Sequence, residues 1–157
     1  MATPRSRPIR NLVTSTPVQT ASLVLGAVFL LVGILGFIPA VTSNLDQLAG
    51  AGHDSGAMLM GLFQVSVLHN IVHIVFGVAG ITAARLASAA EIYLLLGGFI
   101  YLGLWVFGLV IDKDESANFI PLNTADDWLH FTLGTGMIML GILLTHGRRA
   151  DTRTTPS

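Results

Sequence analysis

Four long stretches without a charged residue dominate the pattern of hydrophobic and polar positions along the chain. These uncharged runs cover residues 11–45, 55–84, 92–111 and 128–147. About 20 apolar residues in a helix, rising about 1.5 Å each, span the roughly 30 Å hydrocarbon core of a bilayer. Each run is long enough to do so. The pattern therefore predicts four transmembrane helices, at about residues 18–41, 57–84, 91–111 and 127–146.

The composition of the chain agrees with a membrane protein and excludes several function classes. Of the 157 residues, 52% are hydrophobic and only 11% are charged, and the mean hydropathy is +0.72. Soluble domains carry about 25% charged residues, so a cytosolic enzyme is excluded. A net charge of −1 with no basic, aromatic stripe offers nothing to nucleic acid. The absence of cysteine excludes disulfides, thiolate metal sites and thiol nucleophiles.

The positions of the charged residues predict which way the chain crosses the membrane. Seven of the eight basic residues lie before the first run, between the second and third, or after the fourth; only Lys113 lies elsewhere. With four spans these three places share one side, and the positive-inside rule puts both termini in the cytoplasm. Seven of the nine acidic residues fall in the two opposite loops. We therefore expect an inner-membrane protein with a basic inner face and an acidic outer face.

The predicted fold class is all-α, an integral membrane four-helix bundle covering residues 17–146. Residues 1–16 and 147–157 are rich in Pro, Arg, Thr and Ser and are predicted to be disordered cytoplasmic tails. Asn70, His73 and Gly77 recur at the same spacing as Asp127, His130 and Gly134. This internal repeat predicts two parallel helical hairpins, each with an acidic outer loop and a histidine-bearing return helix.

Small residues within the spans predict where the helices touch. In lipid, glycine lets two backbones approach closely and pack by dispersion. The predicted contact positions are Gly26, Gly33, Gly77, Gly80, Gly134 and Gly141.

Polar side chains gather on one face of the second and fourth predicted helices. At about 100° per residue, each set falls within one sector of its helix, together with glycines. Such a face turns away from lipid, because unpaired polar groups in hydrocarbon are costly. We expect an interhelical cluster in the outer third of the bundle, made of Ser66, His69, Asn70, His73, Asp127 and His130.

Several interpretations of this cluster remain open. It could be a network of interhelical hydrogen bonds, with no cofactor. His69, His73, Asp127 and His130 could instead hold a transition metal such as zinc, copper or non-haem iron, or His73 and His130 could be axial ligands to haem. A third interpretation is proton-linked transport, since imidazole titrates near neutral pH.

Two motifs resemble a known family. The Leu-His-Asn-x-x-His motif at residues 68–73 and the Asn-Phe-x-Pro-Leu-Asn-x-x-Asp stretch at residues 118–126 are similar to those of the bacterial membrane proteins catalogued as domain of unknown function 4383. The resemblance covers roughly residues 17–146. It implies a small four-helix membrane protein and supplies no catalytic residues.

The sequence as a whole favours a non-enzymatic membrane protein. Its expected partners are the lipid bilayer and, through association, further copies of itself or other membrane proteins. The alternatives are a metal- or haem-binding redox protein using His69, His73 and His130, and a proton-linked small transporter or channel.

Overall fold

The computed structural model describes residues 16–151, with the backbone alone for 146–151. Four helices dominate this part of the chain: α1 (Pro17–Leu35), α2 (Val67–Ala83), α3 (Ala87–Val110) and α4 (Thr124–Asp151). The prediction of a helical chain with four helices is confirmed. Of the predicted tails, residues 1–15 and 152–157 lie outside the described residues. Residues 147–151 were predicted to be disordered, but their backbone continues α4.

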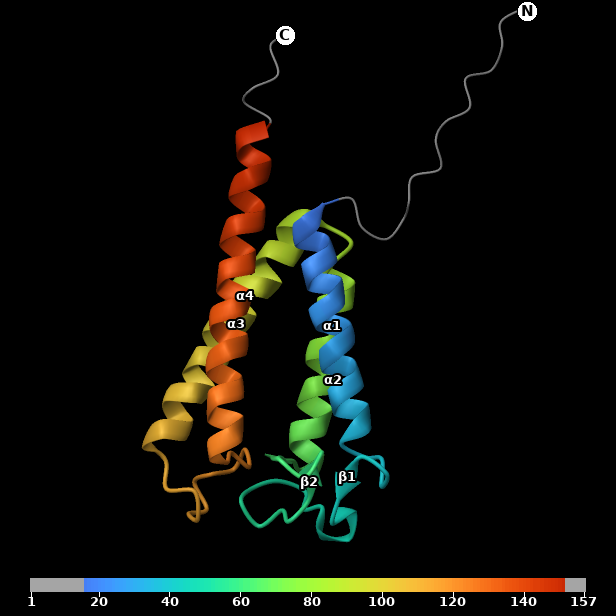
Figure 1. Cartoon of the computed structure of the whole chain (residues 1–157), viewed down its shortest axis with the longest axis vertical. Coiled ribbons are helices and arrows are strands. Elements are labelled where there is room, and N and C mark those ends of the chain that lie inside the picture. Colours follow the sequence, from blue (N-terminus) through green and yellow to red (C-terminus); the bar gives the residue numbers. More distant parts are fainter. Residues whose placement is uncertain (1–15, 152–157) are drawn as a thin grey trace, which may run out of the picture.

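The four helices form two hairpins. Helix α1 packs chiefly on α2, and α3 packs chiefly on α4. Figure 1 shows α1 beginning, α4 ending and the short α2–α3 turn lying at one end of the molecule. The loops that follow α1 and α3 lie at the opposite end. The chain therefore crosses the length of the molecule four times.

The loop between α1 and α2 contains a small antiparallel sheet, which replaces part of a predicted helix. Its strands are β1 (Thr42–Ser43), β2 (Met58–Leu59) and β3 (Phe63–Gln64), in the order β1-β2-β3, with Thr42 opposite Leu59 and Met58 opposite Gln64. A short 3-10 helix spans Leu45–Gln47.

The prediction of a helix over residues 57–84 is wrong at its start. Between β2 and β3 the chain turns through Met60 and Gly61, both with positive φ, a conformation that ends regular helix. Helix α2 begins only at Val67, where the Ser66 hydroxyl accepts a hydrogen bond from His69 N and caps the first turn.

The other helix ends also differ from the predicted ones. Helix α1 ends at Leu35 rather than 41, and the hydroxyl of Thr42 donates a hydrogen bond to the Leu35 carbonyl oxygen. Pro39 lies just beyond and cannot continue a helix. Helix α3 begins at Ala87, four residues earlier than predicted, because only residues 84–86 connect it to α2.

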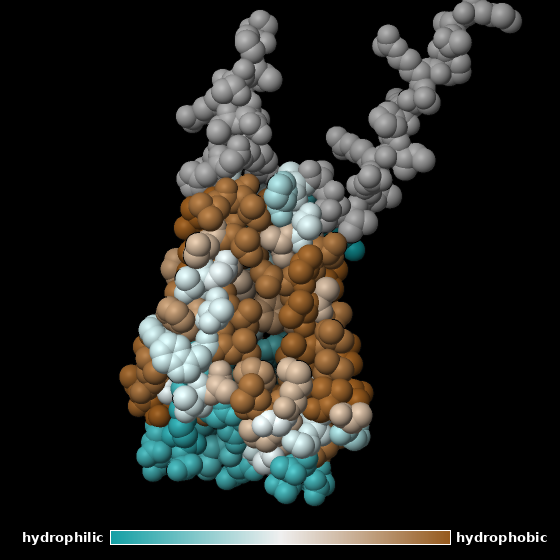
Figure 2. All heavy atoms as spheres, viewed as in Figure 1, coloured by the Kyte–Doolittle hydropathy of each residue, from teal (hydrophilic) through white to brown (hydrophobic). Residues whose placement is uncertain are grey.

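The surface of the helices is apolar. Figure 2 shows a hydrophobic belt over the helices and hydrophilic side chains at the end that carries the loops. Large apolar side chains on every helix are more than half exposed, among them Val24, Val75, Phe99 and Leu143. Helices α1 and α3, and residues Thr124–Thr145 of α4, are long and apolar enough to cross a membrane. Helix α2 is apolar but has 17 residues, the lower limit of about 17 to 25 for a spanning helix.

Backbone contacts at glycine hold each hairpin together. A methyl group on Gly26 of α1 would lie 2.6 Å from Ile81 N and 2.8 Å from Gly77 O of α2. A methyl group on Gly134 of α4 would lie 2.9 Å from Gly98 O of α3. A methyl group would meet a neighbouring helix at all six predicted glycines: at Gly141 it would meet only the side chains of Leu94 and Leu95, and at the other five it would also meet backbone, namely at Gly26, Gly33, Gly77, Gly80 and Gly134.

Large side chains fill the space between the hairpins. Phe29 of α1, Phe76 of α2 and Tyr101 of α3 meet with ring centroids 5.1 to 5.8 Å apart. Leu94 and Met137 belong to the same buried cluster. A smaller cluster of Ala57, Leu59 and Val65 lies beneath the sheet and packs on the loop end of α1.

Two glycines of α4 provide a matched test of this packing. Gly134→Ala should lower the thermal midpoint, equivalent to about 1 to 3 kcal/mol of overpacking, because the added methyl group meets the α3 backbone. Gly136→Ala, two residues away with nothing within 4 Å, should leave the midpoint unchanged or raise it, since alanine favours helix. Thermal unfolding of both purified variants in detergent measures the difference. Equal effects would contradict the packing.

Candidate functional site

Two histidines of α2 form the centre of the polar cluster. His69 and His73 lie one turn apart, and their rings stack with centroids 4.4 Å apart and planes 10° apart. Nδ1 of His73 lies 3.0 Å from the carbonyl oxygen of His69. Because a carbonyl oxygen only accepts, Nδ1 of His73 carries a proton. The ring nitrogens of His69 make no hydrogen bond within the described residues.

Tyr101 of α3 connects this pair to the histidine of α4. The Tyr101 hydroxyl lies 3.4 Å from Nε2 of His73, a long hydrogen bond in which the neutral imidazole accepts. The Tyr101 ring also meets the edge of His130, with centroids 5.2 Å apart. His130 is only 3% exposed, and its Nδ1 has no hydrogen-bond partner among the described residues. Two predicted cluster residues, His73 and His130, therefore contact one tyrosine, and His69 stacks on His73.

Asp127 does not join the histidines as predicted. Both of its carboxylate oxygens accept hydrogen bonds from Nζ of Lys113, at 2.8 and 2.9 Å. The same ammonium group donates to Gly108 O at the end of α3, at 2.5 Å. Lys113, which has an acidic residue on either side in the sequence, is thus an ion-pair partner for a carboxylate that is 4% exposed.

Ser66 and Asn70 have other neighbours than the histidines of α4. The Ser66 side chain caps α2. Asn70, 1% exposed, lies against Gly36 at the end of α1, and its side-chain oxygen and nitrogen find no hydrogen-bond partner in the described part of the chain. The prediction that both residues lie between the second and fourth helices does not match this arrangement.

Asp126, the residue before Asp127, connects the two helical hairpins at the end of the molecule that carries the long loops. Asp126 Oδ2 accepts a hydrogen bond from Asn123 N, while Asn123 Oδ1 accepts one from Asp126 N, a reciprocal cap at the start of α4. Asp126 Oδ2 also accepts from Gln64 N of β3, and the Asn123 side chain donates to Leu62 O. We call these contacts the loop clamp.

A cavity of about 350 Å³ opens between α2 and α3, next to the histidine pair. We call it the histidine cavity. Sites for small molecules occupy about 300 to 1,000 Å³, so its volume is sufficient. Apart from imidazoles and a phenol its lining is apolar, and that lining consists of Leu68, His69, Val72, His73 and Phe76 from α2, Ile100, Tyr101 and Leu104 from α3, and Phe119 and Ile120 from the following loop.

A second cavity, of about 180 Å³, touches the same histidines from another side. It lies between α1, the sheet, α2 and α4, and its lining includes His69, His73 and Asp126. The two imidazoles therefore separate two cavities. Figure 2 shows an opening between the hydrophobic surfaces of the helices, with hydrophilic atoms inside it.

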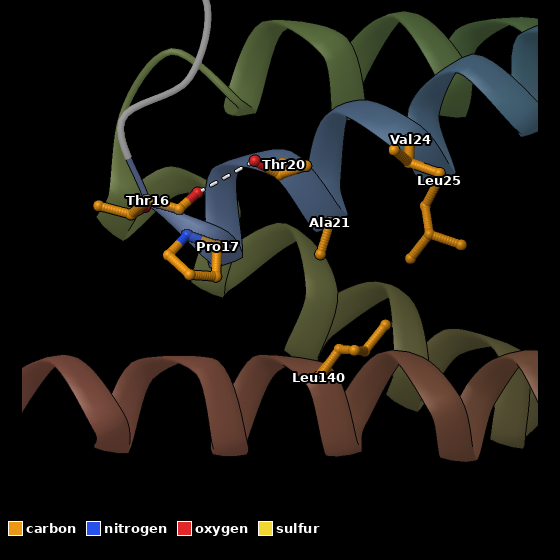
Figure 3. A pocket seen from close by; sticks show the side chains of 7 residues that line it. All are labelled: Thr16, Pro17, Thr20, Ala21, Val24, Leu25 and Leu140. Atoms are coloured by element: carbon orange, nitrogen blue, oxygen red, sulfur yellow. Dashed lines mark hydrogen bonds between the residues drawn. The ribbon is translucent and has the colours of Figure 1, made fainter.

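A third, larger hollow carries no comparable chemistry. It is an open groove of about 730 Å³ near the start of α1, between α1 and α4. Figure 3 shows its side chains, among which only Thr16 and Thr20 are polar, and the Thr20 hydroxyl donates to Thr16 O.

The arrangement bears on the predicted metal and haem sites. Within the described residues, no group of three or more His, Asp or Glu side chains is placed to hold a metal ion. The carboxylate predicted as a ligand belongs to the Lys113 ion pair. His73 and His130, predicted as axial ligands of haem, both contact the side chain of Tyr101 instead.

Comparison with known proteins identifies the family. Residues 19–143 match the model of the family described as domain of unknown function 4383. The chain belongs to this family. No curated protein and no solved structure matches the chain. The region that matches the domain of unknown function 4383 contains His69, His73, His130, Tyr101, the histidine cavity and the loop clamp.

The Lys113 ion pair can be tested with a double-mutant cycle. Lys113→Met should destabilise the protein by about 1.5 to 3 kcal/mol, because it leaves the buried Asp127 carboxylate without its charged donor. The double variant with Asp127→Asn should recover part of that lost stability. Thermal unfolding of the single and double variants measures this coupling between the two residues. Asp114→Asn, in the exposed part of the same loop, is the control and should change little. Additive effects of the two substitutions would argue against the pair.

Proposed function

We propose that the chain is a four-span inner-membrane protein with both termini in the cytoplasm and two parallel helical hairpins. Three helices long enough to span, with an apolar fourth packed on α1, support this topology. The charge distribution supports the orientation, because seven of the eight basic residues fall on the proposed cytoplasmic side. The remaining one, Lys113, is neutralised by Asp127 at the proposed outer face.

Two serine-to-cysteine variants test the topology, since the chain has no cysteine. Ser116 is exposed in the loop after α3, and Ser88 is exposed beside the α2–α3 turn. Cysteine at 116 should react with a membrane-impermeant thiol reagent applied from outside, whereas cysteine at 88 should react only after permeabilisation. If α2 failed to span, the labelling pattern of the two positions would be reversed, and the topology would be wrong.

Within this topology, the function that the geometry supports best is binding of a small lipophilic molecule from the bilayer. The histidine cavity carries this conclusion: an apolar chamber between α2 and α3 contains imidazole and phenol groups beside a mostly hydrocarbon wall. Leu68, Val72 and Ile100 line it and are 37% to 53% exposed on the helix surface. A ligand could therefore enter sideways from lipid. Ionisable side chains within membrane-spanning helices that face the interior of the bundle usually have a function.

This proposal refines the sequence-based expectation of a non-enzymatic protein. That expectation stays a prediction. Association with further copies of the chain or with other membrane proteins stays a prediction. So does proton-linked transport, which gains one supporting observation, namely that His69 and His73 line both cavities.

Photolabelling in liposomes tests the binding proposal. A diazirine-bearing decanol should label residues of α2 and α3 around the histidine cavity, and excess unlabelled decanol should suppress that labelling. Leu104→Trp should abolish it, because a larger side chain fills the cavity. Leu96→Trp on the same helix is the matched control: Leu96 is 58% exposed and lies outside the cavity lining, so labelling should persist. Labelling that does not saturate, or that survives Leu104→Trp, would refute binding in the cavity.

A further inference from the structure

We propose that the ligand of the histidine cavity is a lipid-soluble quinone, a flat ring with two carbonyl oxygens on an apolar tail. This inference rests on the proposed binding function and names the class of molecule bound. It follows from three properties of the cavity, which are the charge of its lining, its free hydrogen-bonding groups and the shape of its walls.

The charge of the lining disfavours an anionic or cationic head. None of the lining residues is Lys, Arg, Asp or Glu. The one basic residue in the loop after α3, Lys113, has its ammonium group occupied by the Asp127 carboxylate and Gly108 O. A phosphate or carboxylate head would therefore lose its hydration without gaining a charged partner. The cavity suits an uncharged head.

The free hydrogen-bonding groups suit an acceptor. His73 and Tyr101 are already engaged, since Nδ1 of His73 donates to His69 O and Nε2 accepts from the Tyr101 hydroxyl. His69 is 8% exposed, lines the cavity and has no ring partner among the described residues. Its neutral imidazole carries one N–H group, and neither ring nitrogen is among the fully buried unpaired atoms of the described residues, so this N–H is available to a hydrogen-bond acceptor. A quinone carbonyl oxygen is such an acceptor.

The walls of the cavity suit a flat ring. Five of its lining residues carry rings, and those of His69 and His73 are stacked with their planes nearly parallel. Aromatic rings gain from stacked or edge-to-face contact with another ring in addition to the area they bury. The tail would leave between α2 and α3, across the exposed side chains of Val72 and Ile100. A straight-chain alcohol would make the hydrogen bond and would lose the ring contacts.

Competition against the photoactivatable decanol tests the quinone proposal with the full chain in liposomes. The competitors are a decyl-benzoquinone, decylbenzene, which has the same tail and ring without carbonyl groups, and decyl phosphate. We expect the quinone to suppress labelling at about one-tenth of the decylbenzene concentration, as the one hydrogen bond from His69 would give. Decyl phosphate should be the weakest competitor.

Substitutions of His69 test whether this side chain is the donor responsible for the preference for quinone over decylbenzene. His69→Phe keeps a ring and removes the donor, so the quinone and decylbenzene should become equally effective; His69→Leu serves if that variant fails to fold. His69→Gln, which restores an N–H donor, should restore the preference. His53→Phe is the matched control, because His53 lies in the loop between β1 and β2, outside the cavity, and should retain the tenfold difference.

The outcomes separate the two proposals. Saturable decanol labelling with equal suppression by quinone and decylbenzene, or with strongest suppression by decyl phosphate, would overturn the quinone and leave lipophile binding in place. If the preference for quinone over decylbenzene persists in His69→Phe, the assignment of His69 as the hydrogen-bond donor is wrong. Absence of saturable labelling in the unsubstituted protein would refute the binding function itself, and the quinone proposal with it.

Discussion

The arrangement of this bundle depends on the contact of helix backbones at glycine. In hydrocarbon there is no water to expel, so helices gain by dispersion over closely matched surfaces. Gly26 with Gly77, and Gly98 with Gly134, provide those surfaces within the two hairpins. Between the hairpins the packing is made by large rings instead, and all three hollows we describe lie there. Tight hairpins that are held apart by aromatic side chains leave space for a ligand.

The polar residues complement this packing at the end of the bundle that carries the loops. The loop clamp of Asn123 and Asp126 joins the start of α4 to the hairpin of β2 and β3, so the hairpins are connected there by directional hydrogen bonds. The Lys113 ion pair fixes the end of α3 to α4 in the same region. The histidines therefore sit beside the most strongly tethered end, where a site made from separate helices can keep its geometry.

The sequence was sufficient for the helical architecture and the contact glycines, because hydropathy and small-residue spacing depend on local chemistry. It was insufficient where a contact joins distant segments. Residues 57–66 are apolar enough for a helix, yet Met58 and Leu59 pair in a sheet. Asp127 was assigned to the histidines, but the helix rotation turns it towards Lys113 and gives Asp126 the place beside the second cavity. Tyr101 was not predicted as part of the cluster, because nothing in the local sequence shows that its hydroxyl reaches His73.

If the histidine cavity holds a lipophilic molecule, an experimental structure of the protein purified from its own membrane into lipid should reveal that molecule. We expect elongated density between α2 and α3, with a flat head within hydrogen-bonding distance of the His69 ring and a tail passing Val72 and Ile100. A cavity filled by the protein's own side chains, with His69 bonded to another residue of the chain, would contradict it.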